Sequence, residues 1–263
     1  MKIKQLCFVS GVALATLATA SAAQAALVVV PPALAPGAQY RLVFVTDGTR
    51  DATSFDINDY NTFVTTQARG GTPAIDTALD LALNAAGFNP NTITWKAIAS
   101  TRTGGSSTGV DARDNTGTNP SSTGVPIYLI DGNRVANNNT DLWDGSILRP
   151  INVTQSSTTV PTTPATGTVV WTGSNASGMV RVSGTTNNGL GGTSFAMTGV
   201  TNLATANWIF NNTSDRSNTR RLYGMSSVLT VPKTLEVPEP SSLLGFITLG
   251  GLMLGSAVGK ARK

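Results

Sequence analysis

The chain contains no histidine and only one cysteine, Cys7, which lies near its N-terminus. Its two glutamates, Glu236 and Glu239, both lie near the C-terminus. The lack of histidine excludes a Ser-His-Asp triad and removes the commonest zinc ligand. The lack of a second cysteine excludes a disulfide within the chain. Between the two ends, acid–base chemistry therefore depends on aspartate, and stability must come from packing.

The N-terminus has the pattern of a secretory signal peptide. Lys2 and Lys4 precede the uncharged run 6–20, and Ala23-Gln24-Ala25 then supplies a small-residue cleavage site. A run of about fifteen apolar residues is short for a bilayer span, which disfavours the alternative of an uncleaved membrane anchor. We expect residues 1–25 to be removed and the protein to be exported.

The C-terminal residues 236–263 contain a second targeting pattern. Pro238-Glu239-Pro240 comes first, an uncharged stretch follows over 243–259, and the basic segment 260–263 ends the chain. A helix of about 17 residues reaches about 26 Å, near the lower limit for a bilayer span, with its basic end on the cytoplasmic side. This arrangement resembles the PEP-CTERM tails of bacteria that secrete exopolysaccharide. The resemblance implies that an exosortase removes the tail after transient inner-membrane anchoring and delivers the protein to the cell surface or extracellular space; a retained tail anchor is the alternative.

The formal net charge of +4 belongs mostly to these targeting segments. Lys2 and Lys4 contribute +2, and the basic residues of 260–263 outweigh Glu236 and Glu239 by +1, which leaves the rest of the chain near +1. That part is rich in Asn, Thr, Ser and Gly. Because it has no basic excess to form a footprint for a polyanion, we expect no nucleic-acid partner.

Residues 26–235 are long enough for one domain with a substantial core. Two helices are predicted early, one capped by Ser54 and ended by Gly70, the other running from Thr72 to Gly87. From their β-branched and aromatic residues, strands are predicted at 40–46, 93–99, 125–130, 169–173, 207–210 and 222–231. We therefore expect an α+β domain in which the two early helices pack on an antiparallel-rich sheet with long loops. That sheet is expected to contain the strands at Tyr40, Trp95, Val125 and Leu222.

Four short segments follow one another in a suggestive order: 95–100 (WKAIAS), 125–132 (VPIYLIDG), Leu142-Trp143 and 170–174 (VWTGS). This order resembles that of endostatin, a collagen-derived domain, and it implies a C-type-lectin-like fold. The disulfides and zinc-binding histidines of that family are absent from this sequence, as are the calcium and sugar-binding motifs of true lectins. No metal site or receptor-binding role follows from the resemblance.

Aspartates are concentrated in the predicted loops in the middle of the chain: Asp111, Asp114, Asp131, Asp141 and Asp144. Loop carboxylates are ligands that calcium prefers, so calcium is the candidate metal, although the spacing is not that of an EF-hand. The simpler interpretation is that these aspartates cap turns and pair with neighbouring arginines. Two of them acting as acid and base would instead make an aspartate-dependent polysaccharide hydrolase.

A basic cluster near the end of the domain is the second candidate site. Arg216, Arg220 and Arg221 with Tyr223 are predicted to form an aromatic-edged patch for acidic polysaccharide, because arginine forks suit carboxylates. The alternative is solvated loop charge paired with Asp215. The four tryptophans, among apolar neighbours, are expected in the core. We expect a non-enzymatic binding or matrix module without a resident cofactor; the hydrolase is the alternative.

Overall fold

The computed structural model describes residues 27–70, 77–160, 168–183 and 186–233. The predicted signal peptide, the sorting motif at Pro238-Glu239-Pro240 and the apolar stretch 243–259 lie outside these residues. Within the described part of the chain, no helix has the length and apolar character needed to cross a bilayer.

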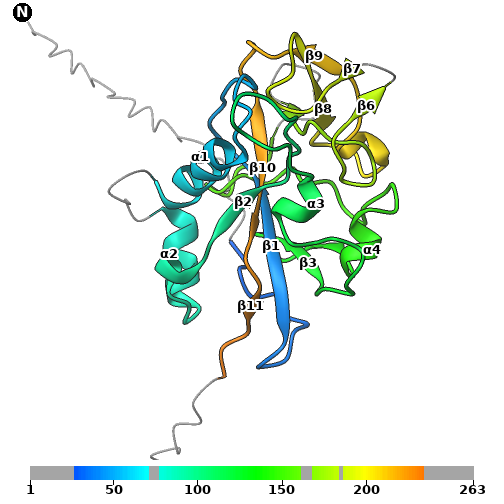
Figure 1. The fold of residues 1–263 in the computed structure, drawn as a ribbon. Coiled ribbons are helices and arrows are strands. Elements are labelled where there is room, and N and C mark those ends of the chain that lie inside the picture. Colours follow the sequence, from blue (N-terminus) through cyan, green and yellow to red (C-terminus); the bar gives the residue numbers. More distant parts are fainter. Residues whose placement is uncertain (1–26, 71–76, 161–167, 184–185, 234–263) are drawn as a thin grey trace, which may run out of the picture.

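The described chain folds as a mixed α+β domain around a nine-stranded sheet (Figure 1). Along the sheet the strand order is β4-β3-β1-β10-β5-β8-β9, while β11 also pairs with β1 and β2 also pairs with β10. The pairs β1–β3 and β10–β5 are parallel and the other pairs in this sheet are antiparallel. The strands are β1 (Gln39–Val45), β2 (Trp95–Ala97), β3 (Ile127–Leu129), β4 (Arg134–Ala136), β5 (Val169–Trp171), β8 (Phe195–Val200), β9 (Thr213–Asp215), β10 (Arg221–Ser226) and β11 (Leu229–Thr230).

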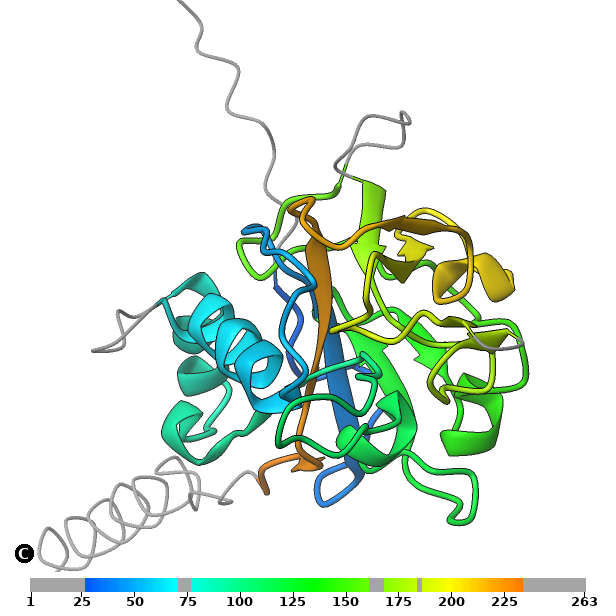
Figure 2. The same cartoon turned by 45° about the horizontal axis from the view of Figure 1, so that its top comes forward.

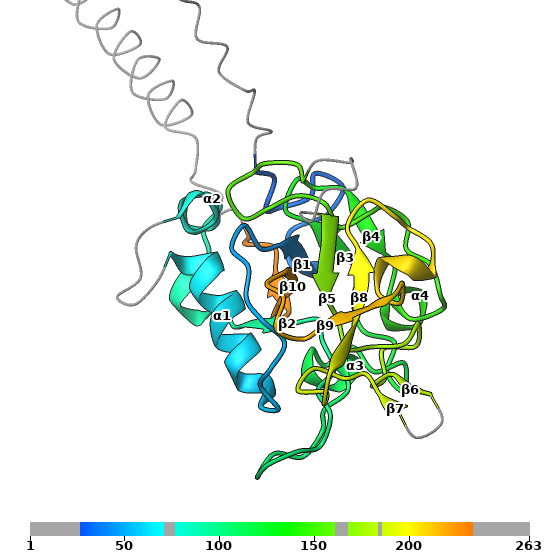
Figure 3. The same ribbon diagram turned by 90° about the horizontal axis from the view of Figure 1, so that it is seen from above.

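The four strands expected to share a sheet do so, since β1 lies between β3 and β10, and β10 also pairs with β2. Strands β2 and β5 occupy different parts of the same edge of β10: β2 pairs with Gly224 to Ser226, and β5 pairs with Arg221 and Leu222. The two helices α1 and α2 lie on one side of these central strands, and the later strands and loops lie on the other (Figures 1 and 2). The view from above shows the same division (Figure 3).

Helix α1 (Ile57–Arg69) follows the sequence pattern closely. Its N-cap is Asp56, whose side chain accepts a hydrogen bond from the backbone N–H of Asn58, and not Ser54 as predicted. Ser54 lies just outside the helix and donates to the carboxylate of Asp59. Gly70 ends the helix in the left-handed region, at φ 76°, where a residue without Cβ pays no steric penalty.

Helix α2 (Ala78–Ala85) is shorter than its sequence pattern predicted. The described helix has Thr77 as its N-cap, and the predicted cap at Thr72 lies outside the described residues. Its leucines at positions 79 and 83, which are four residues apart and so lie on one face of the helix, are buried. The remaining short elements are α3 (Ala112–Asn115), α4 (Asn139–Leu142), the 3-10 turns η1 (Pro90–Thr92) and η3 (Ala206–Trp208), and the hairpin of β6 (Val182–Ser183) and β7 (Thr186–Asn187).

The core joins α1 to the central strands without any cross-link. Val64 of α1 packs over β10 at Gly224, where a Cβ would come within 2.6 Å of a Val64 methyl carbon. This close approach requires glycine at position 224. All four tryptophans are buried, as expected, and Trp143 and Trp208 pack together with their ring centroids 5.8 Å apart.

Two predictions of secondary structure were wrong or incomplete. Residues 207–210 were predicted as a strand, but the chain there forms the 3-10 turn η3 after Thr205. A run of three apolar residues, as in Trp208-Ile209-Phe210, does not distinguish a strand from a buried turn, because either can bury the same residues. The sequence did not predict strands β4, β8 and β9 or helix α3. Strand β8 has buried residues in succession and contains Gly199, so it lacks the alternation that marks a half-buried strand.

Candidate functional site

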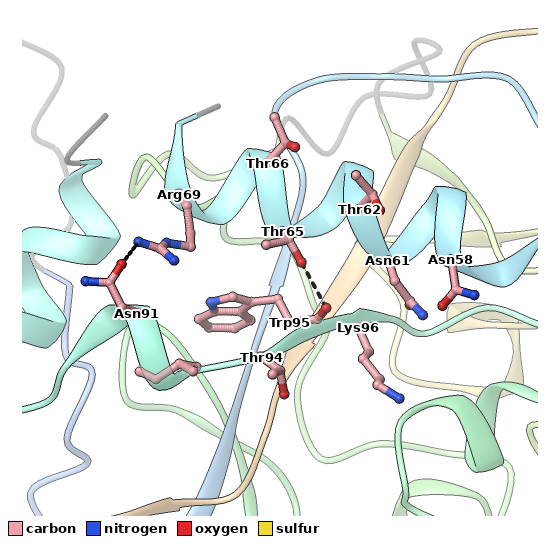
Figure 4. Close-up of a pocket in the computed structure, with 11 residues that line it drawn as sticks. Asn58, Asn61, Thr62, Thr65, Thr66, Arg69, Asn91, Thr94, Trp95 and Lys96 are labelled. Atoms are coloured by element: carbon pink, nitrogen blue, oxygen red, sulfur yellow. Dashed lines mark hydrogen bonds between the residues drawn. The ribbon is translucent and has the colours of Figure 1, made fainter. Parts of the chain in front are cut away.

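A cavity lies between helix α1 and strand β2 (Figure 4). It has a volume of about 610 Å³, and we call it the α1–β2 groove. Helix α1 supplies one wall, and the segment from η1 through β2 supplies the other. The lining residues are Asn58, Asn61, Thr62, Thr65, Thr66, Arg69, Asn91, Ile93, Thr94, Trp95 and Lys96.

The floor of the groove is built by polar side chains that complete the open edge of β2. Asn61 accepts a hydrogen bond from the backbone N–H of Ala97 at 2.9 Å, and Thr65 donates to the carbonyl of Trp95 at 3.1 Å (Figure 4). Asn115 of α3 donates to the carbonyl of Ala97 at 2.7 Å. An unpaired strand edge must satisfy its backbone groups in some way, and here amides and a hydroxyl from two helices do so.

Other polar groups in the groove remain open to solvent. Asn58, Thr62 and Thr94 are exposed, and each carries a hydrogen-bonding side chain without a net charge. The cavity therefore presents amides and hydroxyls along its length, above the buried apolar residues Ile93 and Trp95. Such a surface can bind a ligand that carries many hydroxyl groups.

The two cations of the groove stand at opposite ends in Figure 4. At one end Arg69 donates through Nη2 to the side-chain oxygen of Asn91, and its Nε lies 3.7 Å from the Asp80 carboxylate. At the other end lies the exposed Lys96 (Figure 4). No carboxylate is among the described residues that line this cavity, so the lining carries a positive charge.

The groove continues into a smaller cavity at each end. A cavity of about 220 Å³ shares Thr94 and Lys96 with it and is also lined by Arg41, whose pKa is lowered by burial. A cavity of about 240 Å³ shares Arg69 and Asn91 with it. The shared residues place the three cavities next to one another, and each of the smaller two has one acidic lining residue, Asp114 in the first and Asp80 in the second.

The five aspartates predicted as calcium ligands each serve a separate local structure. Their hydrogen-bond donors are the backbone N–H of Val180 for Asp111, the amide of Asn119 for Asp114, the backbone N–H and side-chain amide of Asn133 for Asp131, the backbone N–H of Asn137 for Asp141, and the backbone N–H and hydroxyl of Ser146 for Asp144. Among the residues that the structure describes, no three acidic side chains form a group that could hold a metal ion. The arrangement corresponds to the turn-capping interpretation.

The predicted basic patch is not assembled in the way the sequence suggested. Tyr223 is fully buried, burial raises the pKa of its phenol, and its hydroxyl donates to the carbonyl of Trp208, so it does not edge a surface. The Nη1 atom of Arg221 lies 3.5 Å from Oδ1 of Asp47 and donates a hydrogen bond to the carbonyl of Thr46. A strand places successive side chains on opposite faces, which explains why residues 221 and 223 do not share a surface with residue 220.

Arg220 and Arg216 also have structural partners. The guanidinium of Arg220 lies 5.3 Å from the ring centre of Trp171 and donates to the hydroxyl of Ser214, and burial lowers its pKa. Arg216 donates to the carbonyl of Gly192 at 2.7 Å. These arginines fasten loops to the end of the sheet.

Sequence reasoning missed the α1–β2 groove. The available signal was the polar side of α1, with Asn58, Asn61, Thr62, Thr65 and Thr66 in a helix of only moderate amphipathicity. Threonine and asparagine are poor helix formers, and five of them in one short helix indicate a role other than helix formation. The search of protein-family models gave no match for this chain, and the search of curated proteins likewise gave none.

Proposed function

We propose that the chain is an exported protein, sorted by an exosortase to the cell surface or the extracellular polysaccharide, and that residues 26–235 form a non-enzymatic polysaccharide-binding module with a C-type-lectin-like fold. The observation that carries the binding role is the α1–β2 groove, a cavity of about 610 Å³ that is lined mainly by amides and hydroxyls and by no acidic residue. The targeting segments support the destination. The two early helices beside a largely antiparallel sheet, with long loops after it, support the fold.

The distribution of carboxylates supports binding over hydrolysis. A glycosidase needs two carboxyl groups that flank the bond to be cleaved, one as an acid and the other as a base or nucleophile. The described residues of the groove supply none, and Asp111 and Asp144 are engaged with the backbone of their own turns or a neighbouring loop.

Binding is tested with the exported protein and the polysaccharide purified from its own host. Thr62 is exposed on α1 inside the groove, so Thr62→Trp fills the groove without disturbing the core. Thr140 is equally exposed on helix α4, away from the groove, and Thr140→Trp is the matched control. We expect sedimentation or calorimetry to show binding that Thr62→Trp abolishes and Thr140→Trp retains. Binding that survives Thr62→Trp would remove the groove from the proposal.

The hydrolase alternative makes an opposite prediction for the same samples. We expect no release of reducing ends during prolonged incubation with the polysaccharide. Release that disappears in Asp111→Asn or Asp144→Asn would establish the hydrolase and overturn the non-enzymatic role.

The sorting part of the proposal is tested by intact-mass spectrometry of protein from the native host. The expected mature protein begins near Ala26 and has lost the tail near Pro238. A mass that still includes residues 243–263 would show a permanent anchor in place of exosortase processing.

A further inference from the structure

One hydrogen-bond donor in the groove is buried and has no acceptor. Only 2% of Trp95 is exposed, and its indole Nε1 has no hydrogen-bond partner. Trp143 and Trp171 differ, because their indole N–H groups donate to the carbonyls of Thr118 and Arg50, each at 3.0 Å. The indole Nε1 of the buried Trp208 is also without a partner, but Trp208 does not line the groove. Leaving a buried donor unpaired is unfavourable, and most such groups in proteins do have a partner.

The unpaired donor of Trp95 lies at the arginine end of the groove. Figure 4 shows the indole nitrogen on the side of the ring toward Arg69, and both residues line the same cavity. Arg69 Nε is likewise buried and makes no hydrogen bond, although the Asp80 carboxylate lies 3.7 Å from it. The Arg69 guanidinium is held in place by the Asn91 side-chain oxygen on one side and by Asp80, 4% exposed, on the other. Two fixed N–H donors of different residues thus border one pocket.

We propose that this end of the groove is a subsite for the carboxylate of an acidic sugar, with Trp95 Nε1 and Arg69 as its donors. The inference rests on the proposed polysaccharide-binding function and names the class of sugar. A carboxylate has only acceptor atoms and can receive two hydrogen bonds at once, which matches a site bordered by the N–H donors of Trp95 and Arg69. Ile93 and the ring of Trp95 exclude water from the floor of the site, which strengthens such bonds.

The charges of the groove favour an anionic sugar over a neutral one. Asp80 offsets part of the charge of Arg69, but it lies on α2 and lines the neighbouring cavity, not the groove itself. Lys96 adds a second cation at the far end, where Arg41 and Asp114 line the neighbouring cavity, so a chain of acidic sugars would meet a cation at both ends of the groove. The neutral lining residues between them suit the hydroxyl groups of the same chain.

The test compares three hexasaccharides by calorimetry on the exported protein: oligogalacturonate, its methyl ester and N-acetylated chitohexaose. The methyl ester keeps the same sugar but removes the negative charge, so we expect it to bind at least about tenfold more weakly than the acid. Arg69→Gln should remove that preference, and the double variant Arg69→Gln/Asp80→Asn, which leaves no unpaired buried charge, should do the same. Arg113→Gln is the matched control, since Arg113 is buried to a similar degree beside Asp111 and lies outside the groove.

A spectroscopic measurement tests the role of Trp95 directly. In ¹⁵N-labelled protein the indole N–H signal of Trp95, assigned by its loss in Trp95→Phe, should move downfield when oligogalacturonate is added. The signals of Trp143 and Trp171, which already have acceptors, should stay in place. A shift with the methyl ester equal to that with the acid, or no shift of the Trp95 signal with bound acid, would overturn the carboxylate subsite.

The failure of the subsite and the failure of the proposed function give different results. Host polysaccharide that binds in a manner sensitive to Thr62→Trp, together with equal affinity for the acid and its ester or a preference for chitohexaose, overturns the carboxylate subsite alone. Absence of binding to the host polysaccharide and to all three hexasaccharides overturns both.

Discussion

The amide network beneath the groove gives the most specific prediction about stability. Asn61 accepts from the backbone N–H of Ala97 at 2.9 Å, donates to the Asn115 side-chain oxygen at 3.0 Å and accepts from the Asn115 amide at 2.9 Å. Asn61→Ala removes all three hydrogen bonds and leaves the fully buried Ala97 without a partner for its N–H. The edge of β2 would lose the group that completes it.

The expected cost follows from the hydrogen bonds that are lost. A buried N–H without an acceptor costs about 1–3 kcal/mol, and each lost hydrogen bond of the amide pair about 1 kcal/mol. Asn61 is partly exposed, so water from the groove replaces some of this interaction. We expect Asn61→Ala to lower the free energy of unfolding by about 2–4 kcal/mol, a large part of the total for a single domain.

Urea denaturation followed by tryptophan fluorescence measures this change. Asn58→Ala is the matched control, because Asn58 is one turn earlier on α1 and exposed; its effect should stay within about 0.5 kcal/mol. Asn61→Asp retains the acceptor for Ala97 but loses the amide donor, so it should fall between the two. If Asn61→Ala costs no more than Asn58→Ala, the network does not support the edge of β2 and the reasoning fails.

Three further predictions follow from the core and the loops. Millimolar calcium or a chelator should leave the melting temperature unchanged, because each aspartate of the middle loops already serves its own turn or loop; a rise of several degrees with calcium would restore the calcium site. Burial raises the pKa values of Tyr40, Tyr60 and Tyr223 in the folded protein. The stability that their neutral phenols contribute is therefore complete below the unfolded pKa of about 10, and it declines as the pH rises above that value. Tyrosinate absorbance should therefore appear together with unfolding, and ionisation of these phenols in the folded protein would contradict this. Trp208→Ala should cost about 3–5 kcal/mol in urea denaturation, because the ring is fully buried against its aromatic neighbours; a cost below about 1 kcal/mol would show that this part of the core is dispensable.

Much of the secondary structure and the identity of the core could be predicted from local patterns. Helix α1 can be predicted because helix periodicity and a left-handed end are local properties. Both are visible in the sequence, as the apolar stripe of Ile57, Tyr60 and Val64 and as Gly70 at the end of the helix. The first and last strands are recognisable because their β-branched and aromatic residues are buried together. Strand β8 and the turn η3 could not be distinguished in this way, since short buried segments of either type have the same composition.

The candidate sites show a different limit of sequence reasoning. The aspartates of the middle loops and the arginines near Tyr223 were predicted as sites because the members of each group are close in sequence. Side chains that are close in sequence nevertheless diverge when they belong to different turns or to opposite faces of a strand. The groove instead joins the polar side of α1 to the edge of β2, about 30 residues further along the chain, and no local pattern records which segments will meet.

The sequence by itself determined which chemical groups the protein has. It contains no histidine, no thiol in the predicted mature domain and no glutamate between the predicted targeting segments, so the core must rest on apolar packing. The predicted export and sorting signals, on which the proposed location depends, also come from the sequence alone, because such signals are read as linear segments. The tertiary structure decided where ligands can meet the chain. Packing α1 on β10 at Gly224 leaves the edge of β2 facing the helix, and that juxtaposition turns ordinary threonines and asparagines into a groove and leaves the indole N–H of Trp95 without an acceptor.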